Sequence, residues 1–304
     1  VILGAGAVAL EFASLWNAAG CEVTLLIRKD RVLSTWERRA SMTLTRELKR
    51  RGVNVIARTA VDRVDTGANL GATVHYRQGD SDEDRTAYGE VVLAAIGRVP
   101  NTDADWFRSS GLKLDERGYV TVDGYGRTNL DGVWALGDIT PGHALAHRAF
   151  EQGITIAEKI AGADPKPVID DTVPQVVFSF PEAASVGLTL DQAKALEDVV
   201  EPKETAYPML SNARMLMSGE GGSMTVVSGA FANNPDMQVV LGVHIVSPIA
   251  SDLIAEAEQL VGNRVPLADA ARLIHPHPTF SETLGEALLK GDGRPLQYEI
   301  GGVE

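Results

Sequence analysis

The first hundred residues alternate short apolar runs with segments whose apolar residues recur at helical spacing. Leu15 and Trp16 follow Phe12 by three and four residues, which places all three on one face of a helix. The expected order is strand 1–3, helix 9–19, strand 22–27, helix 36–51 and strand 53–57, with further strands at 61–64, 72–77 and 90–96 and a turn at 79–85. Strands separated by helices run parallel, so this order predicts an α/β fold.

The pattern changes twice after residue 100. Short strands and glycine turns occupy 101–164, with a helix expected at 144–160, and the proline-containing stretch 163–167 predicts a linker. Strands and helices beyond it are segregated, which is typical of an α+β domain. We therefore predict three domains, at 1–100, 101–167 and 168–304.

Composition and charge narrow the class of protein. The chain has 304 residues, is 44% hydrophobic and carries a formal charge of −13. Such a charge repels phosphates and anionic membranes, so we expect neither nucleic acid nor membrane partners. Its single cysteine, Cys21, cannot form a disulfide within the chain, which favours a reducing, cytoplasmic setting. Cys21 follows a helix and is expected to be a buried small hydrophobe. Because the chain opens inside a strand without methionine, we expect a piece of a longer protein.

A glycine loop follows the first strand and precedes the first helix. Residues 4–9 read Gly-Ala-Gly-Ala-Val-Ala and fit the G-x-G-x-x-G/A fingerprint in the strand-to-helix context that it requires. Small residues at Gly4, Gly6 and Ala9 let the backbone approach a pyrophosphate at the helix N-terminus. With Glu11 on the helix, they are our candidate dinucleotide contacts. The alternative is a tight turn without a ligand.

The end of the second strand bears on the choice of cofactor. An acidic residue there accepts the ribose 2′-hydroxyl of NAD, whereas a 2′-phosphate calls for arginine. Ile27 stands near that position and is followed by Arg28 and Lys29, which suit the phosphate of NADP. Asp30 keeps NAD open, and a solvated pair of cations is the alternative. We favour NADP slightly.

Two further strings resemble the pyridine nucleotide-disulfide oxidoreductases. Residues 95–102 read Ala-Ile-Gly-Arg-Val-Pro-Asn-Thr and look like the crossing from the nicotinamide domain to the flavin domain, with Gly97 allowing close backbone approach to a ligand. Residues 128–138 end in Gly-Val-Trp-Ala-Leu-Gly-Asp. By this resemblance Asp138, at the end of a buried strand, accepts hydrogen bonds from the ribityl chain of FAD. The alternative is an Asp138 that caps the following turn.

Residues 145–151, Leu-Ala-His-Arg-Ala-Phe-Glu, resemble the stretch that starts a helix beside the flavin ring in dihydrolipoamide dehydrogenases. A helix N-terminus there stabilises negative charge on reduced flavin. The resemblance implies that the backbone near Ala146 and His147 contacts FAD. It does not make His147 a catalyst, and a helix-surface residue is its alternative role.

Residues 275–282 read His-Pro-His-Pro-Thr-Phe-Ser-Glu and resemble the family's His-x-His-Pro-Thr-x-x-Glu pattern. The resemblance implies that His277 exchanges a proton with the substrate thiol and that Glu282 orients its ring. Imidazole titrates near neutral pH and only a thiolate attacks a disulfide, so these residue types suit the chemistry. Thr279 and Glu282 also form a capping-box pattern. His275 has no assigned role beyond that of a structural histidine.

The resemblance implies a Rossmann-like NAD(P)-binding domain at 1–100, the C-terminal part of an FAD domain at 101–167 and an α+β dimerisation domain at 168–304. Members of this family also have a separate glycine-rich FAD loop and a Cys-x4-Cys pair. Neither occurs in the 304 residues, so we expect this chain alone to be inactive.

The leading hypothesis for the parent is a flavoenzyme of the dihydrolipoyl dehydrogenase type. It would pass electrons between a small-molecule or lipoyl-domain dithiol, FAD and NAD or NADP, as a homodimer in a 2-oxoacid dehydrogenase complex, without a metal. The alternatives are an NADPH-dependent disulfide reductase resembling glutathione reductase, a quinone or mercuric reductase relative, or a non-catalytic nucleotide-binding and dimerising module.

Overall fold

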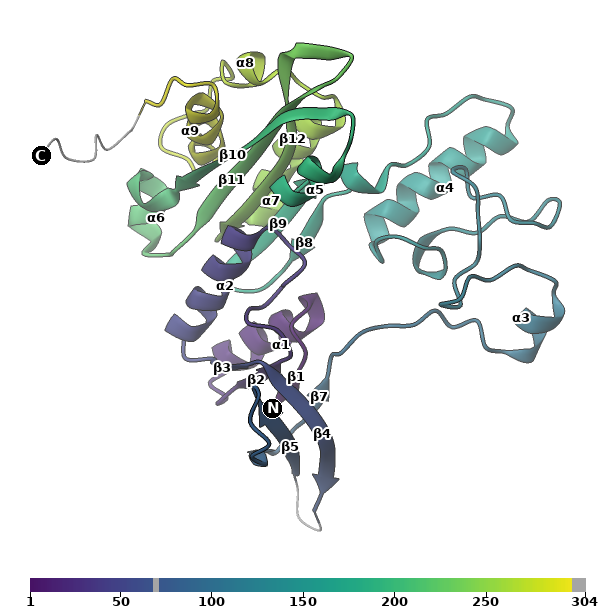
Figure 1. The fold of residues 1–304 in the computed structure, drawn as a ribbon, viewed down its shortest axis with the longest axis vertical. Helices are drawn as coiled ribbons and strands as arrows, with labels where there is room; N and C mark the ends of the chain where they lie inside the picture. Colours follow the sequence, from purple (N-terminus) through teal and green to yellow (C-terminus); the bar gives the residue numbers. More distant parts are fainter. Residues whose placement is uncertain (68–70, 297–304) are drawn as a thin grey trace, which may run out of the picture. The chain divides into compact units, whose positions relative to one another are not determined.

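The computed structural model describes residues 1–67 and 71–296 (Figure 1). The chain forms two compact units, one made of residues 1–96 with 174–304 and the other of residues 97–173. Residues 297–304 of the domain expected at 168–304 lie outside the described residues.

A parallel sheet forms the first part of the larger unit. Its strands are β1 (Ile2–Leu3), β2 (Thr24–Ile27), β3 (Asn54–Ala57) and β7 (Leu93–Ala94), in the order β3-β2-β1-β7. Helices α1 (Ala7–Ala18) and α2 (Arg38–Arg50) connect the first three strands. The strand side chains Ile2, Leu25 and Ile27 are buried in one core with both helices. The predicted α/β order with a parallel sheet is confirmed.

A three-stranded antiparallel sheet follows, made of β4 (Thr59–Thr66), β5 (Ala72–Gln78) and β6 (Arg85–Gly89). Val74 and Tyr76 of β5 share a face and pack against Leu3 and Leu26. The turn expected at 79–85 is one residue too long, because Arg85 already pairs with Tyr76 as the first residue of β6. Of the strand expected at 90–96, only Leu93–Ala94 is paired.

The rest of this unit is an antiparallel sheet with helices against it (Figure 1). Its strands are β8 (Gln175–Val177), β9 (Glu182–Gly187), β10 (Val199–Pro208), β11 (Ser223–Phe231) and β12 (Asn234–Ser247), in the order β10-β11-β12-β9-β8. The helices are α5 (Leu190–Ala195), α6 (Ala213–Ser218), α7 (Ala250–Gly262), α8 (Leu267–Ala270) and α9 (Glu282–Gly291), with the 3-10 turn η3 (Met209–Ser211). Val243 and Ile245 pack with α7, α8 and α9, whereas Val246 packs with α1 and α2. The alternation of side chains along β12 thus buries both faces.

The second unit contains the helices α3 (Asp105–Ser109) and α4 (Ala146–Ile160) and the 3-10 turns η1 (Gly137–Ile139) and η2 (Asp170–Thr172). The buried strand expected before Asp138 is wrong, since that stretch forms only an isolated bridge between Arg127 and Trp134. Its backbone pairs with the adjacent residues 126–128, where the Ala135 N–H donates to the carbonyl of Gly126 at 2.9 Å and the Thr128 N–H donates to that of Val133 at 3.1 Å. This pairing is too short to form a strand.

The expected burial of Cys21 is wrong, because its side chain is exposed. It follows Gly20, whose φ of +85° turns the chain away from the end of α1. Burial resumes only at Val23, just before β2 begins.

Within residues 1–67 and 71–296, no helix combines the length and apolar character that crossing a membrane requires.

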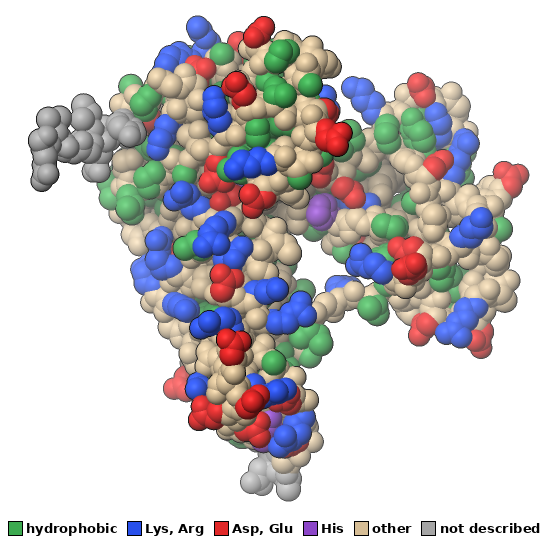
Figure 2. Space-filling view, viewed as in Figure 1, with side chains coloured by type: hydrophobic (Ala, Val, Ile, Leu, Met, Phe, Trp, Pro, Cys, Tyr) green, Lys and Arg blue, Asp and Glu red, His purple; other side chains and the backbone are tan. Residues whose placement is uncertain are grey.

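The surface carries both signs of charge (Figure 2). Lys and Arg side chains gather over α2, whose sequence holds arginines at 38, 39, 46 and 50 and a lysine at 49. The acidic excess of the whole chain is therefore not evenly spread.

Candidate nucleotide and acid-base sites

Gly4 and Gly6 of the first loop differ in the space that a side chain would have. Gly4 has a φ of +131°, and a Cβ there would strike the carbonyl oxygen of Ala95 at the end of β7. A Cβ on Gly6 would meet nothing within 4 Å. Gly4 is thus required by packing, whereas Gly6 leaves open space at the start of α1. No side chain of residues 1–67 or 71–296 caps that helix, and its first turn has no acidic residue, so its N–H groups are available to an anion.

Glu11 contacts the third part of the chain. Its Oε1 accepts the backbone N–H of Phe178 at 3.0 Å, and Ser14 Oγ accepts that of Phe180 at 3.0 Å. The carboxylate that we counted as a nucleotide contact therefore also ties α1 to the segment between β8 and β9. This role joins residues 167 positions apart and has no signal in the sequence.

The cations at the end of β2 differ in their partners. Asp30 is bound by Arg31, with Nη1 3.0 Å from Oδ1. Arg28 and Lys29 are exposed and form no ion pair with any described residue. Arg58, which the sequence interpretation missed, donates its backbone N–H to the carbonyl of Lys29 at 3.0 Å and is likewise exposed and without an ion pair among the described residues. Its signal was its place directly after β3, the strand beside β2.

The predicted flavin contacts Gly97, Asp138, Ala146 and His147 all belong to the unit 97–173. Gly97 has a φ of +145° and open space where a Cβ would stand. Asp138 is exposed in η1, and its carboxylate accepts no hydrogen bond from any described residue, so the capping alternative is not realised. The two remaining residues, Ala146 and His147, begin α4, which has neither a side-chain cap nor an acidic residue in its first turn.

Helix α4 holds the turn of Asp138 from both sides. Gln152 Oε1 accepts the N–H of Gly137 at 2.8 Å. Arg148, which is buried, donates to the carbonyl of Pro141 at 2.6 Å and to Asp170 Oδ1 at 2.6 Å. The string 145–151 gives no signal for this role of Arg148, because its partners follow only from the fold.

His277 and Glu282 meet as expected at the start of α9. The Nδ1–H of His277 donates to Glu282 Oε1 at 2.8 Å, while Glu282 Oε2 accepts the N–H of Thr279 at 2.8 Å. The carboxylate thus serves both the ring and the helix start. Desolvation raises the pKa of Glu282, but the Thr279 N–H and the His277 ring outweigh it and bring the pKa below its ordinary value. The His277 side chain is 72% exposed and open to a substrate.

His275 has a separate carboxylate partner. Its Nε2 lies 2.8 Å from Glu256 Oε1 on α7, and its side chain is 9% exposed. The hydrogen bond that His275 donates to Glu256 raises the pKa of His275 against the opposing effect of burial.

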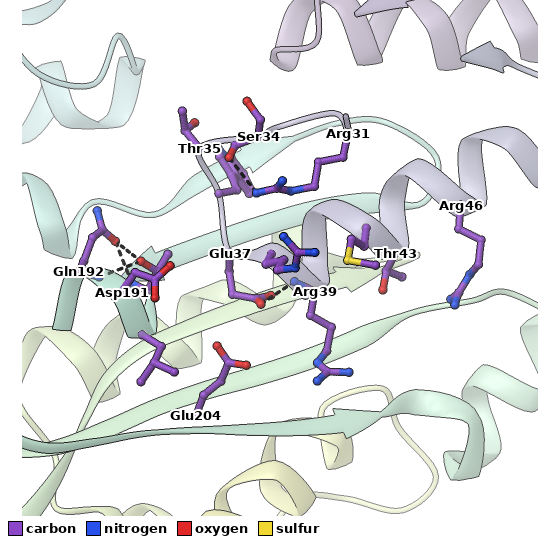
Figure 3. Close-up of a pocket in the computed structure, with 15 residues that line it drawn as sticks. Arg31, Ser34, Thr35, Glu37, Arg39, Thr43, Arg46, Asp191, Gln192 and Glu204 are labelled. Atoms are coloured by element: carbon purple, nitrogen blue, oxygen red, sulfur yellow. Dashed lines mark hydrogen bonds between the residues drawn. The ribbon is translucent and has the colours of Figure 1, made fainter. Parts of the chain in front are cut away.

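A cleft of about 910 Å³ lies within the larger unit (Figure 3). The segment from Arg31 to Arg46 lines one side, and residues 189–192 with Glu204 line the other. Arg39 points across it toward Glu204, whose pKa is raised by burial and by Glu37. None of the predicted site residues lines this cleft.

Comparisons with known proteins agree along the chain. Residues 1–153 match the family model of the pyridine nucleotide-disulphide oxidoreductases, and residues 173–288 match the dimerisation domain of that family. The dihydrolipoyl dehydrogenase of Cupriavidus necator is 37% identical over 97% of this chain and 60% of its own length. That of Geobacillus stearothermophilus is 34% identical over 97% of this chain and 61% of its own. The chain therefore spans about three-fifths of these relatives.

Solved structures have the same fold. LpdA from Mycobacterium tuberculosis superposes with a TM-score of 0.83 at 29% identity, covering 95% of this chain and 60% of that one. The flavoprotein disulfide reductase RclA from Escherichia coli superposes with a TM-score of 0.81 over 94% of this chain and 63% of its own, and at 24% identity it supports the fold alone.

Proposed function

Because the chain belongs to the pyridine nucleotide-disulphide oxidoreductase family, we propose that it forms part of a flavin-dependent enzyme of the dihydrolipoyl dehydrogenase type. The family resemblance found in the sequence is thereby confirmed. The observation that carries the proposed activity is the His277–Glu282 pair, joined at 2.8 Å with the histidine open to solvent. A dithiol or disulfide, on a small molecule or a lipoyl domain, is the proposed substrate.

The pair is suited to moving a proton at sulfur. Glu282 occupies Nδ1 of His277 and leaves Nε2 without a partner among the described residues. Nε2 can therefore take the proton of a substrate thiol and return it, because disulfide exchange requires a thiolate. Glu282 holds the ring in the tautomer that carries its proton on Nδ1.

Residues of the chain fit both cofactors. FAD, when bound, carries electrons between the dithiol and the nicotinamide nucleotide. The Asp138 carboxylate has no partner among the described residues and would hold the ribityl hydroxyls of FAD. Gly97 and the start of α4 at Ala146 and His147 would lie close to the flavin. Gly4, Gly6 and Ala9 would place the uncapped N-terminus of α1 against the pyrophosphate of the nucleotide, with Glu11 beside it.

We further propose that the nucleotide is NADP. Arg31 already neutralises Asp30, which weakens the case for an acidic contact to a ribose hydroxyl. Arg28, Lys29 and Arg58 leave three cations without ion pairs in the described structure, and a 2′-phosphate needs such donors. These cations also favour the second candidate function, an NADPH-driven disulfide reductase.

We place the enzyme in the cytoplasm as a homodimer, with a 2-oxoacid dehydrogenase complex as a partner. The match to the dimerisation domain supports the dimer. So do the exposed apolar side chains Leu210, Leu216 and Met217 on η3 and α6, which would otherwise face water. The single cysteine is consistent with a reducing compartment.

Lipoamide-dependent turnover of NADH and NADPH tests this function. In a complete protein that carries this chain, His277→Gln is expected to lower turnover by about 10²- to 10⁴-fold while flavin absorbance is retained. His75→Gln removes a histidine from another carboxylate pair, 2.9 Å from Asp65, and is the matched control. Unchanged turnover in His277→Gln would refute the assignment. The 304-residue chain alone, with one cysteine, is expected to show none.

A further inference from the structure

The loop before α9 presents two histidines, each bonded to a carboxylate of a different helix. His277 binds Glu282 of α9 and is largely exposed, whereas His275 binds Glu256 of α7 and is largely buried. The outer pair faces a substrate under the proposed function. The His275–Glu256 pair, here the inner pair, is too buried to reach a substrate. Its role in the site is therefore to hold neighbouring residues in position.

Glu256 stands on a helix that the core holds in place. Its neighbours Leu253, Ala257 and Leu260 are buried against the five-stranded sheet. The Glu256 side chain itself is 34% exposed, so its removal leaves that core intact. His275 therefore ties the loop to a rigid element through a single carboxylate.

Gly285 brings α9 directly onto the His275 ring. A Cβ at Gly285 would lie 2.5 Å from His275 Nδ1 and 2.9 Å from Cε1, closer than real atoms approach. Glycine is a poorer helix former than alanine, so this close contact gives a structural reason for a glycine at this position of α9. Gly285 stands three residues after Glu282, on the same side of α9. The ring thus lies between Glu256 and the turn of α9 that carries Glu282.

We propose that His275 is a positioning residue, which the Glu256 carboxylate and the Gly285 backbone hold so that α9 presents Glu282 to His277. The proposal rests on the proposed proton-carrying role of His277. Asn212 also holds this loop, because its side chain donates to the carbonyl of Thr279 at 2.9 Å. This hydrogen bond does not involve His275 or Glu256.

Hydrogen exchange of the Thr279 amide in the 304-residue chain tests the proposal, because this N–H is protected by Glu282 Oε2. Glu256→Ala and Gly285→Ala are each expected to reduce its protection by about 3- to 10-fold relative to buried amides of β11. His275→Gln keeps a donor toward Glu256 and is expected to preserve it. In a His275→Ala background, Gly285→Ala should have less effect, because the ring that the new methyl strikes is gone.

His75→Ala on β5 breaks a remote histidine-carboxylate pair and is expected to leave Thr279 unchanged. Thr279 protection that stays at the unsubstituted level in Glu256→Ala and Gly285→Ala would overturn the proposal. A fall shared equally by Thr279 and the β11 amides would overturn it too, since the pair would then contribute only to global stability. The measurement uses neither substrate nor cofactor, so a failed turnover test of His277 refutes the proposed function without deciding this one.

Discussion

Glu282 binds His277 through one carboxylate oxygen and the N–H of Thr279 through the other, each at 2.8 Å. The two roles that the sequence left as alternatives, orienting a ring and holding a helix start, are therefore compatible. The helix start fixes the carboxylate, and the fixed carboxylate directs the ring.

The loop of His275 and His277 should be most stable in mildly acidic solution. The lowered pKa of Glu282 contributes stability above its ordinary value of 4.5 that is lost as pH falls. The raised pKa of His275 contributes stability below its ordinary value of 6.5 that is lost as pH rises through the folded-state pKa. Both contributions are present together between pH 4.5 and 6.5. Glu256→Ala keeps Glu282, so the difference in Tm between this variant and the unsubstituted chain should follow His275 alone. The difference should be larger below pH 6.5 and shrink as the pH rises through the folded-state pKa of His275; a pH-independent difference would contradict this.

The glycine loop offers a matched pair of substitutions. Gly6→Ala adds a methyl to open space, so we expect a nearly unchanged free energy of unfolding but weaker nucleotide binding. Gly4→Ala strikes the Ala95 carbonyl at a φ of +131° and should lower the free energy of unfolding by more than 1 kcal/mol, on the order of other strained positions. Urea denaturation and calorimetric titration with NADPH measure the two effects. Equal stability of both variants would disprove this division.

Cofactor choice should depend on the unpaired cations. Arg28→Ala and Arg58→Ala each remove a donor for the 2′-phosphate and should weaken NADPH binding by about 10- to 100-fold while changing NADH binding little. Arg31→Ala releases Asp30 and should shift the preference toward NADH. Titration of each variant with both nucleotides gives the ratio. A clear preference of the unsubstituted chain for NADH would contradict the phosphate assignment.

Arg148 should stabilise the unit of residues 97–173. Arg148→Met removes buried hydrogen bonds to Pro141 and Asp170, and we expect the free energy of unfolding of this unit to fall by about 1.5–3 kcal/mol. Lys159 is also on α4, and Lys159→Met breaks its exposed ion pair with Asp164, which follows the helix; this should cost about 0–1 kcal/mol. Hydrogen exchange within α4 reports both, and equal losses would show that burial of the pair is unimportant.

The sequence by itself determined the parts of this protein that depend on local pattern. Helical and strand periodicity determined the parallel order around β1, β2 and β3. The resemblance of residues 275–282 to the family's pattern implied that Glu282 orients the ring of His277, and the two side chains are hydrogen-bonded. Periodicity failed before Asp138, where an apolar run found no strand to pair with in the described residues.

Only the tertiary structure decided which distant groups meet. Glu11 reaches Phe178, Arg58 lies beside Lys29, and His275 binds Glu256 under Gly285. A hydrogen bond depends on distance and direction to within fractions of an ångström, and those follow from the packing of whole elements rather than from residue type. For the same reason the exposure of Cys21 was decided by the turn at Gly20 and not by its apolar side chain.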